Sequence, residues 1–113
     1  MWQHGAMAYD HDTADRVRRL LAERSDVAEQ PIVGGGLGFM VNGHLCCAVT
    51  KRGLTVRLGP DGKAAALSEP YVVPHLVGER ETKAFVVVEP EGHAGDLLEA
   101  WVNRGLSFVT TLG

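Results

Sequence analysis

The stretch Leu37–Thr50, LGFMVNGHLCCAVT, decides the fold of this 113-residue chain. Two apolar runs flank Asn42-Gly43, and an Asn-Gly pair between apolar runs is the strongest short signal for a β-hairpin. A two-residue turn predicts three cross-strand pairs along this hairpin: Val41 with His44, Met40 with Leu45, and Phe39 with Cys46.

Both faces of the predicted hairpin are apolar. One face carries Leu37, Phe39, Val41, Cys46 and Ala48, and the other carries Met40, Leu45, Cys47 and Val49. Such a hairpin must be covered on both sides, by two layers of this chain or by one layer and a partner.

On the N-terminal side of the hairpin, residues 12–24 have the pattern of a helix. Asp12-Thr13-Ala14-Asp15 resembles a capping box, and apolar residues then recur at helical spacing. The arginines of this segment fill the opposite face, which is typical of a solvated helix surface.

On the C-terminal side, the pattern alternates between strands and short helices. Leu54–Pro60 (LTVRLGP) predicts a half-buried strand, Lys63–Glu69 a short helix, Tyr71–Thr82 an irregular segment and Lys83–Glu89 a strand. Asp96 and Glu99 form a second capping box before a closing helix that contains Trp101. The order is a helix, three or four antiparallel strands, a short helix, a further strand and a closing helix. It predicts an α+β domain: an antiparallel sheet packed with an N-terminal helix, a C-terminal helix and a short middle helix.

Composition excludes several classes of protein. Apolar residues make up 45% of the chain and charged residues 22%, which argues against disorder. The formal net charge is -3, from 11 basic and 14 acidic side chains, which argues against direct binding to duplex DNA and against a polybasic membrane anchor. Only residues 30–75, with four basic and two acidic side chains, are net positive.

The ends and the cysteines predict a cytoplasmic location. Met1–Ala6 lacks the basic and apolar regions of a secretion signal, and we take it as an extension, either native or left from cloning, before a domain that covers residues 7–113. No apolar run approaches the roughly 20 residues of a membrane span. Cys46 and Cys47 are adjacent on a predicted strand, where neighbouring side chains point to opposite faces, so we expect two free thiols in a reducing compartment.

Catalytic and metal motifs are not found, so we expect no enzyme activity, no cofactor and no metal. The five histidines lack metal-ligand spacing, and His44 beside Cys46 is a weak candidate for a nucleophile pair. Gly34–Gly38 (GGGLG) precedes a strand and lacks the Gly-Lys-Ser/Thr ending of a phosphate-binding loop, so a bulge or tight corner is the better interpretation.

One basic constellation has a functional interpretation. Arg57 lies on the less apolar face of its strand, and Arg80 and Lys83 approach the last strand from the irregular segment. If these strands are neighbours, the three cations converge on a small anion. The alternative is a solvated surface in which they pair with Glu79 and Glu81.

Residues 7–112 resemble the TfoX N-terminal domain family, also called the Sxy family. The resemblance is carried by MAYDHDTADRVRRLLAERSDV (7–27), GGGLGFMVNGHLCCAV (34–49), LTVRLGP (54–60) and PEGHAGDLLEAWVNRGLSFVTTL (90–112). Its most specific part is Gly-Gly-x-x-Phe-Met-x-Asn-Gly, and the matching residues, together with the tryptophan of the closing helix, are Gly35, Gly36, Phe39, Met40, Asn42, Gly43 and Trp101.

The resemblance implies an α+β domain linked to natural competence. Full-length relatives carry a second, C-terminal domain and act with the cAMP receptor protein at certain promoters. We therefore expect a cytoplasmic regulatory module that contacts a protein partner or a second copy of itself. The alternative is a domain that binds a small anion or other small ligand through Arg57, Arg80 and Lys83.

Overall fold

The computed structural model describes residues 9–32 and 34–112, so the predicted extension Met1–Ala6 lies outside the described residues. The elements follow in this order: α1 (His11–Leu20), β1 (Val27–Pro31), β2 (Leu37–Val41), β3 (His44–Thr50), β4 (Gly53–Arg57), α2 (Gly59–Ala66), β5 (Val72–Val77), β6 (Arg80–Val88), the 3-10 helix η2 (Pro90–His93) and α3 (Leu97–Val109).

The strands form one sheet in the order β1-β2-β3-β4-β6-β5, and every neighbouring pair is antiparallel. With its N-terminal, middle and C-terminal helices, this sheet confirms the predicted α+β class. It has six strands, more than the four or five predicted.

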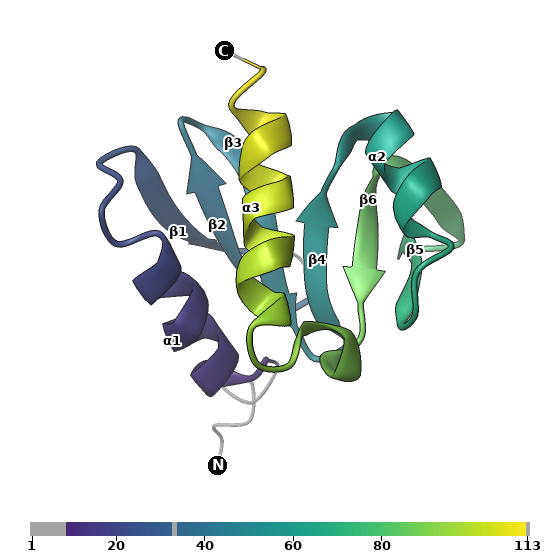
Figure 1. Ribbon diagram of the computed structural model, residues 1–113, viewed down its shortest axis with the longest axis horizontal. Coiled ribbons are helices and arrows are strands. Elements are labelled where there is room, and N and C mark those ends of the chain that lie inside the picture. The colour runs from purple at the N-terminus through teal and green to yellow at the C-terminus, as the bar shows by residue number, and fades with distance from the viewer. Residues whose placement is uncertain (1–8, 33, 113) are drawn as a thin grey trace.

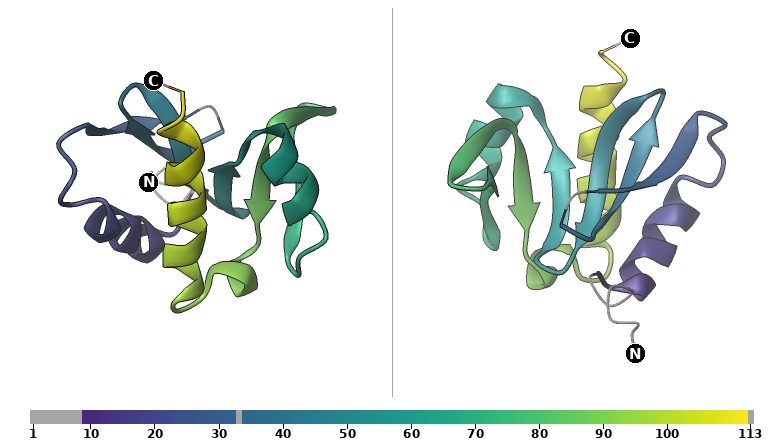
Figure 2. Two further views of the ribbon diagram at one scale, coloured as in Figure 1. Left: turned by 45° about the horizontal axis from the view of Figure 1, so that its top comes forward. Right: turned by 180° about the vertical axis from the view of Figure 1, so that it is seen from behind.

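The three α-helices lie on one face of the sheet (Figure 1), and in the view from behind no helix crosses in front of the strands (Figure 2). The core fills the space between the sheet and the helices. Phe39, Leu54 and Val56 of the strands are fully buried there against Val17 of α1 and Val102 of α3. We call the opposite side of the sheet the helix-free face, with respect to the described residues.

The predicted hairpin is present, with one change of register. Asn42 (φ 51°) and Gly43 (φ 82°) make its turn in the left-handed region, as a primed two-residue turn requires. The pairs of Val41 with His44 and Met40 with Leu45 are confirmed, whereas Phe39 pairs with Cys47 and not with Cys46. A β-bulge at this point adds Cys46 to one strand as an extra residue.

The bulge changes where the thiols lie. Cys46 and Cys47 are both fully buried, and both belong to the core between sheet and helices, so the expected alternation between opposite faces is wrong at this step. Both are free thiols, as predicted. Cys46 contacts α3 at Gly105, where an added Cβ would lie 3.1 Å from both the carbonyl oxygen and the Sγ of Cys46. This glycine therefore allows α3 to approach the bulge closely.

Helix α1 begins earlier and ends earlier than predicted. Its N-cap is Asp10, whose carboxylate accepts hydrogen bonds from the Asp12 N–H (3.3 Å) and the Thr13 hydroxyl (2.6 Å). The predicted capping box at Asp12 therefore lies inside the helix. The box predicted at Asp96 is also not formed, since Asp96 is the N-cap of α3 but its side chain makes no capping bond.

Two outer strands were not predicted. β1 follows α1 as an edge strand of mostly exposed residues, and β5 lies in the segment predicted to be irregular. Pro74 is tolerated in β5 because an edge strand needs hydrogen bonds on one side only, and the pairing with β6 shifts just after it. Pro60, predicted to end a strand, instead starts α2.

Candidate functional site

A cleft of about 320 Å³ opens on the helix-free face. Three parts of the fold form it: the turn between β1 and β2, the β3–β4 turn with β4, and β5. The lining residues are Ile32, Gly34, Gly36, Thr50, Lys51, Arg52, Thr55, His75 and Leu76. These elements are far apart in sequence, and the sheet order brings them to one face (Figure 2).

The glycine-rich segment forms one wall of the cleft. Gly34 and Gly35 have φ values of 96° and 97°, a region that glycine adopts without strain. A Cβ on Gly36 would lie 2.8 Å from the Val49 carbonyl oxygen, so only glycine lets this segment approach β3 so closely. This geometry agrees with the tight corner that the sequence predicts for the glycine-rich segment. The same segment borders the cleft.

Two cations lie at one end of the cleft. Lys51 and Arg52 belong to the β3–β4 turn, and both are exposed. Neither side chain forms an ion pair within the described part of the chain. The Thr50 hydroxyl accepts a hydrogen bond from the Arg52 backbone N–H at 3.2 Å, which holds the turn against the strand. Their charges are therefore available to a ligand in the cleft.

His75 of β5 adds a titratable group to the lining of the cleft. The Thr82 hydroxyl donates to the His75 carbonyl oxygen (3.2 Å), so its oxygen is left to accept from the His75 Nδ1–H at 3.0 Å. This arrangement assigns the proton of the neutral ring to Nδ1 and leaves Nε2 for a ligand. Burial, and then the charge of Arg52, lower the pKa of His75 below its ordinary value.

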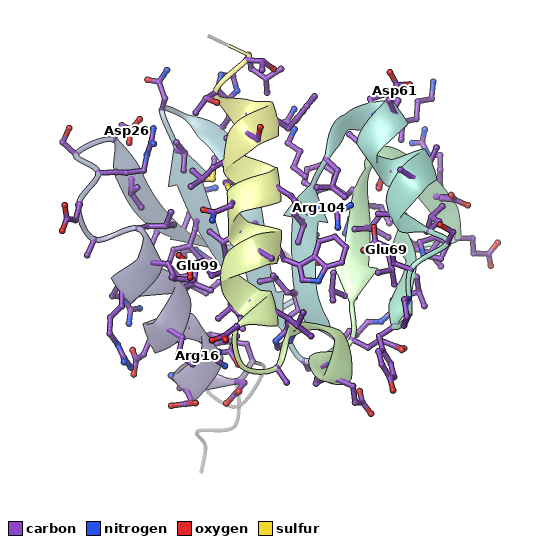
Figure 3. All side chains as sticks on the ribbon, viewed as in Figure 1. Arg16, Asp26, Asp61, Glu69, Glu99 and Arg104 are labelled. Carbon is purple, nitrogen blue, oxygen red and sulfur yellow. The ribbon has the colours of Figure 1, made fainter. Side chains whose placement is uncertain are left out.

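Charge is unevenly distributed between the two sides of the sheet. Four cations form ion pairs in the described ranges, and all belong to α1, the segment after it, α2 or α3: Arg18, Arg24, Lys63 and Arg104. Asp61 lies on α2 and Glu99 on α3, while Asp26 lies in the loop between α1 and β1 (Figure 3). By contrast, no described carboxylate lines the cleft. The cleft is therefore locally positive, although the net charge of the chain is -3.

The three cations predicted to bind an anion do not line this cleft. Arg80 and Lys83 are exposed and border a second hollow of about 320 Å³ with Val77, Glu81 and Thr82. Glu81 does not pair with either of them but with Lys63, at 2.5 Å.

Arg57 lies apart from both hollows. Its guanidinium is 5.5 Å from the centroid of Phe85, its cross-strand neighbour, and its Nε is buried without a hydrogen-bond partner among the described residues. Sequence reasoning missed Lys51, Arg52 and His75 because their proximity depends on the β5 strand, which the sequence pattern did not predict.

Most of the residues that carry the family resemblance lie in the core or in turns, where they support the fold. Phe39 is fully buried under the helices, Met40 is half-buried, and Asn42 and Gly43 make the exposed turn. Trp101 is buried, and its indole N–H donates to the Gly92 carbonyl oxygen at 3.0 Å. Gly35 and Gly36 belong to the corner, and Gly36 lines the cleft.

The thiols and His44 do not form a reactive pair. The Cys47 thiol lowers the pKa of Cys46 by hydrogen bonding, whereas that bond and burial raise the pKa of Cys47 well above its ordinary value. Both thiols are closed to solvent, while His44 lies beside the hairpin turn, half-buried.

A further hollow of about 450 Å³ lies between the start of α1, the β3–β4 turn and η2. His93 of η2 is buried there, with an Nδ1 that has no hydrogen-bond partner in the described structure. Asp10 also lines this hollow, but its carboxylate already caps α1. Lys51 lines this hollow as well as the cleft, so the hollow holds charges of both signs, whereas the cleft has no carboxylate from the described residues.

Comparisons with protein-family models, curated proteins and solved structures find no match to this chain. The TfoX resemblance therefore rests on the sequence motifs alone. Across the described ranges, no three His, Cys, Asp or Glu side chains form a group that suits a metal ion. Among the described helices, none has the length and apolar character needed to span a membrane.

Proposed function

We propose that this domain binds a small anionic ligand, such as a phosphate- or carboxylate-bearing metabolite, in the cleft on the helix-free face. The observation that carries the proposal is the lining itself, which combines Lys51, Arg52 and His75 with no carboxylate from the described residues. A cleft of this size suits a small molecule.

The cleft offers each kind of group that recognises an oxyanion. The Arg52 guanidinium presents a planar set of donors to two oxygens, and the Lys51 ammonium adds a mobile charge. The Thr55 hydroxyl also lines the cleft as a neutral donor. Leu76 and Ile32 provide apolar contact for the rest of the ligand.

A thermal-shift screen with pyrophosphate, sulfate, nucleotides and small carboxylates tests this proposal. A ligand at about 100 times its dissociation constant adds about 2.7 kcal/mol, which raises the melting temperature by roughly 10 °C in a domain of this size. We expect Arg52→Gln to remove the shift.

The matched control is Arg80→Gln, which removes one exposed cation outside the cleft. If Arg80→Gln abolishes the shift and Arg52→Gln leaves it, the ligand binds at the originally predicted cations and the cleft assignment fails. If no compound shifts the wild-type protein, anion binding is not its function.

A second candidate is the cytoplasmic regulatory module that the TfoX resemblance implies, acting through a protein partner or a second copy. Exposed apolar side chains at the end of the edge strand β5 favour it, since Leu76 is 44% and Val77 is 65% exposed. Sedimentation at two protein concentrations tests the second-copy form. We expect a dimer that Val77→Asp dissociates, and a wild-type monomer at both concentrations contradicts it.

A further inference from the structure

Beyond the cleft, the helix-free face carries a row of ring and guanidinium groups. Arg57 follows Thr55 by two residues on β4, so both side chains lie on the same face of the sheet. The guanidinium of Arg57 is 5.5 Å from the Phe85 centroid, and the Phe85 and His75 ring centroids are also 5.5 Å apart. His75 lines the cleft, so this row continues the cleft along the sheet.

The row places cations at both ends of β4. Arg52 precedes the strand and Arg57 ends it, and five residues of strand span about 13 Å between their first and last Cα atoms. A single small anion does not reach both cations. A ligand that contacts both needs anionic groups repeated along a chain.

Most of the cations without an ion pair lie along these elements. Lys51, Arg52, Arg57, Arg80 and Lys83 belong to the β3–β4 turn, β4 and β6, and none has an ion-pair partner within residues 9–32 and 34–112. The other two, Arg16 and Arg19, belong to α1. The paired cations belong to the helix side. Such a separation attracts a polyanion to one face of a protein whose net charge is negative.

We propose that the helix-free face binds a single-stranded nucleic acid, with one phosphate in the Lys51–Arg52 cleft and a base near Phe85. This inference rests on the proposed function, because the cleft supplies the first phosphate site. Unstacked bases are held on aromatic rings and guanidinium planes, and Phe85, His75 and Arg57 supply both between the cations. An acidic peptide uses the charges but not the rings, and a duplex hides its bases from them.

The test is the fluorescence anisotropy of a labelled ten-nucleotide oligouridine at several salt concentrations, with pyrophosphate binding measured in parallel. We expect the decamer to bind more tightly than pyrophosphate, and its affinity to fall with salt. Arg52→Gln weakens both ligands. Phe85→Leu keeps an apolar side chain but loses the stacking surface, and lowers decamer affinity by about tenfold.

The variant Arg57→Gln tests whether Arg57 makes the second phosphate contact. We expect it to weaken binding of the decamer more than binding of pyrophosphate. We also expect the slope of log affinity against log salt for the decamer to fall by about 0.7. Arg19→Gln is the matched control, since Arg19 is an exposed α1 cation without an ion pair in the described structure. It leaves both affinities unchanged, and circular dichroism confirms that each variant is folded.

Four outcomes overturn the proposal. If pyrophosphate binds and the decamer binds no more tightly, the face is a small-anion site only and the proposed function stands. If polyglutamate competes as well as oligouridine, the partner is an acidic peptide. If a duplex of equal length binds as tightly as the single strand, the rings have no role. If neither pyrophosphate nor the decamer binds, both proposals fail.

Discussion

Among the described glycines, Gly53 has the least space for a side chain. Its φ is 139°, and an added Cβ would lie 2.1 Å from the Val88 carbonyl oxygen on the neighbouring strand. We expect Gly53→Ala to lower the free energy of unfolding by about 2–4 kcal/mol, because backbone atoms of two strands must separate. Urea unfolding measures the change.

Gly78→Ala is the control for this substitution. Gly78 also has a positive φ, of 63°, but an added Cβ would meet nothing within 4 Å. It therefore carries only the cost of the left-handed conformation, about 1–2 kcal/mol. Equal losses for the two variants would show that the approach of Gly53 to β6 is not a constraint.

His75 predicts a pH dependence of anion binding. Burial and Arg52 lower its pKa below 6.5, so the ring is neutral at pH 7.5 and gains a proton only as the pH falls through the lowered value. Protonation adds a positive charge to the cleft, so anion affinity rises as the pH falls. Calorimetry with sulfate, which stays fully ionised in this range, between pH 7.5 and 5 measures the effect.

The matched variant for this effect is His75→Gln. It keeps a side chain that hydrogen-bonds to Thr82 but carries no proton to gain, so its affinity should vary little with pH. A wild-type affinity that also stays constant would exclude His75 from the site.

At the scale of the elements, a cluster of side chains joins α3 to the segment after α2. Arg104 of α3 donates to both carboxylate oxygens of Glu69 at 2.9 and 3.0 Å, and the two side chains point toward each other in Figure 3. The same guanidinium is 4.1 Å from the centroid of the Trp101 ring. Arg104 therefore holds the segment after α2 against α3.

We expect Arg104→Ala to lower the free energy of unfolding by about 1–2 kcal/mol, since it removes both the ion pair and the contact with the ring. Glu69→Gln removes only the ion pair, which is partly exposed, and should cost less than about 1 kcal/mol. Urea denaturation compares the two. Equal losses would mean that the Trp101 contact contributes nothing.

The elements also show what the sequence pattern predicts and what it leaves out. Asn42-Gly43 fixes the central hairpin, because a primed turn is a local property of two residues. The strands β1 and β5 were missed because an exposed edge strand has no apolar alternation, and because Pro74 indicates a loop. The bulge at Cys46 was also missed. Residues 45–49 are all apolar, so the pattern is the same whether Phe39 pairs with Cys46 or with Cys47.

The candidate site was only partly predictable for the same reason. Sequence reasoning expected Arg57, Arg80 and Lys83 to bind an anion, but these three residues lie outside the cleft. Lys51 and Arg52 line it instead. The position of His75 in the cleft depends on β5 as a strand. Long-range strand order, which sequence periodicity does not encode, therefore determines the site.

At the scale of the whole molecule, His93 predicts acid sensitivity of the fold. Burial lowers its pKa from the ordinary value of 6.5, so the unfolded chain binds more protons below that pH. Its contribution to stability is present above pH 6.5 and is lost as the pH falls through the lowered pKa. Thermal melts at pH 7.5 and 5 should show a smaller decrease for His93→Gln than for wild type, and equal decreases would contradict this assignment.

The central feature of this account is the distribution of charge: the ion pairs of the described residues lie on the helix side, while the cleft on the helix-free face holds Lys51 and Arg52 without a carboxylate. It predicts that an anion binds at one defined place on the sheet. Titration of the ¹⁵N-labelled protein with pyrophosphate, followed by NMR of the backbone amides, tests this most directly. We expect saturable shifts centred on Gly34, Gly36, Lys51, Arg52 and His75. Shifts centred on Arg80 and Lys83, or weak shifts that never saturate, would contradict the account.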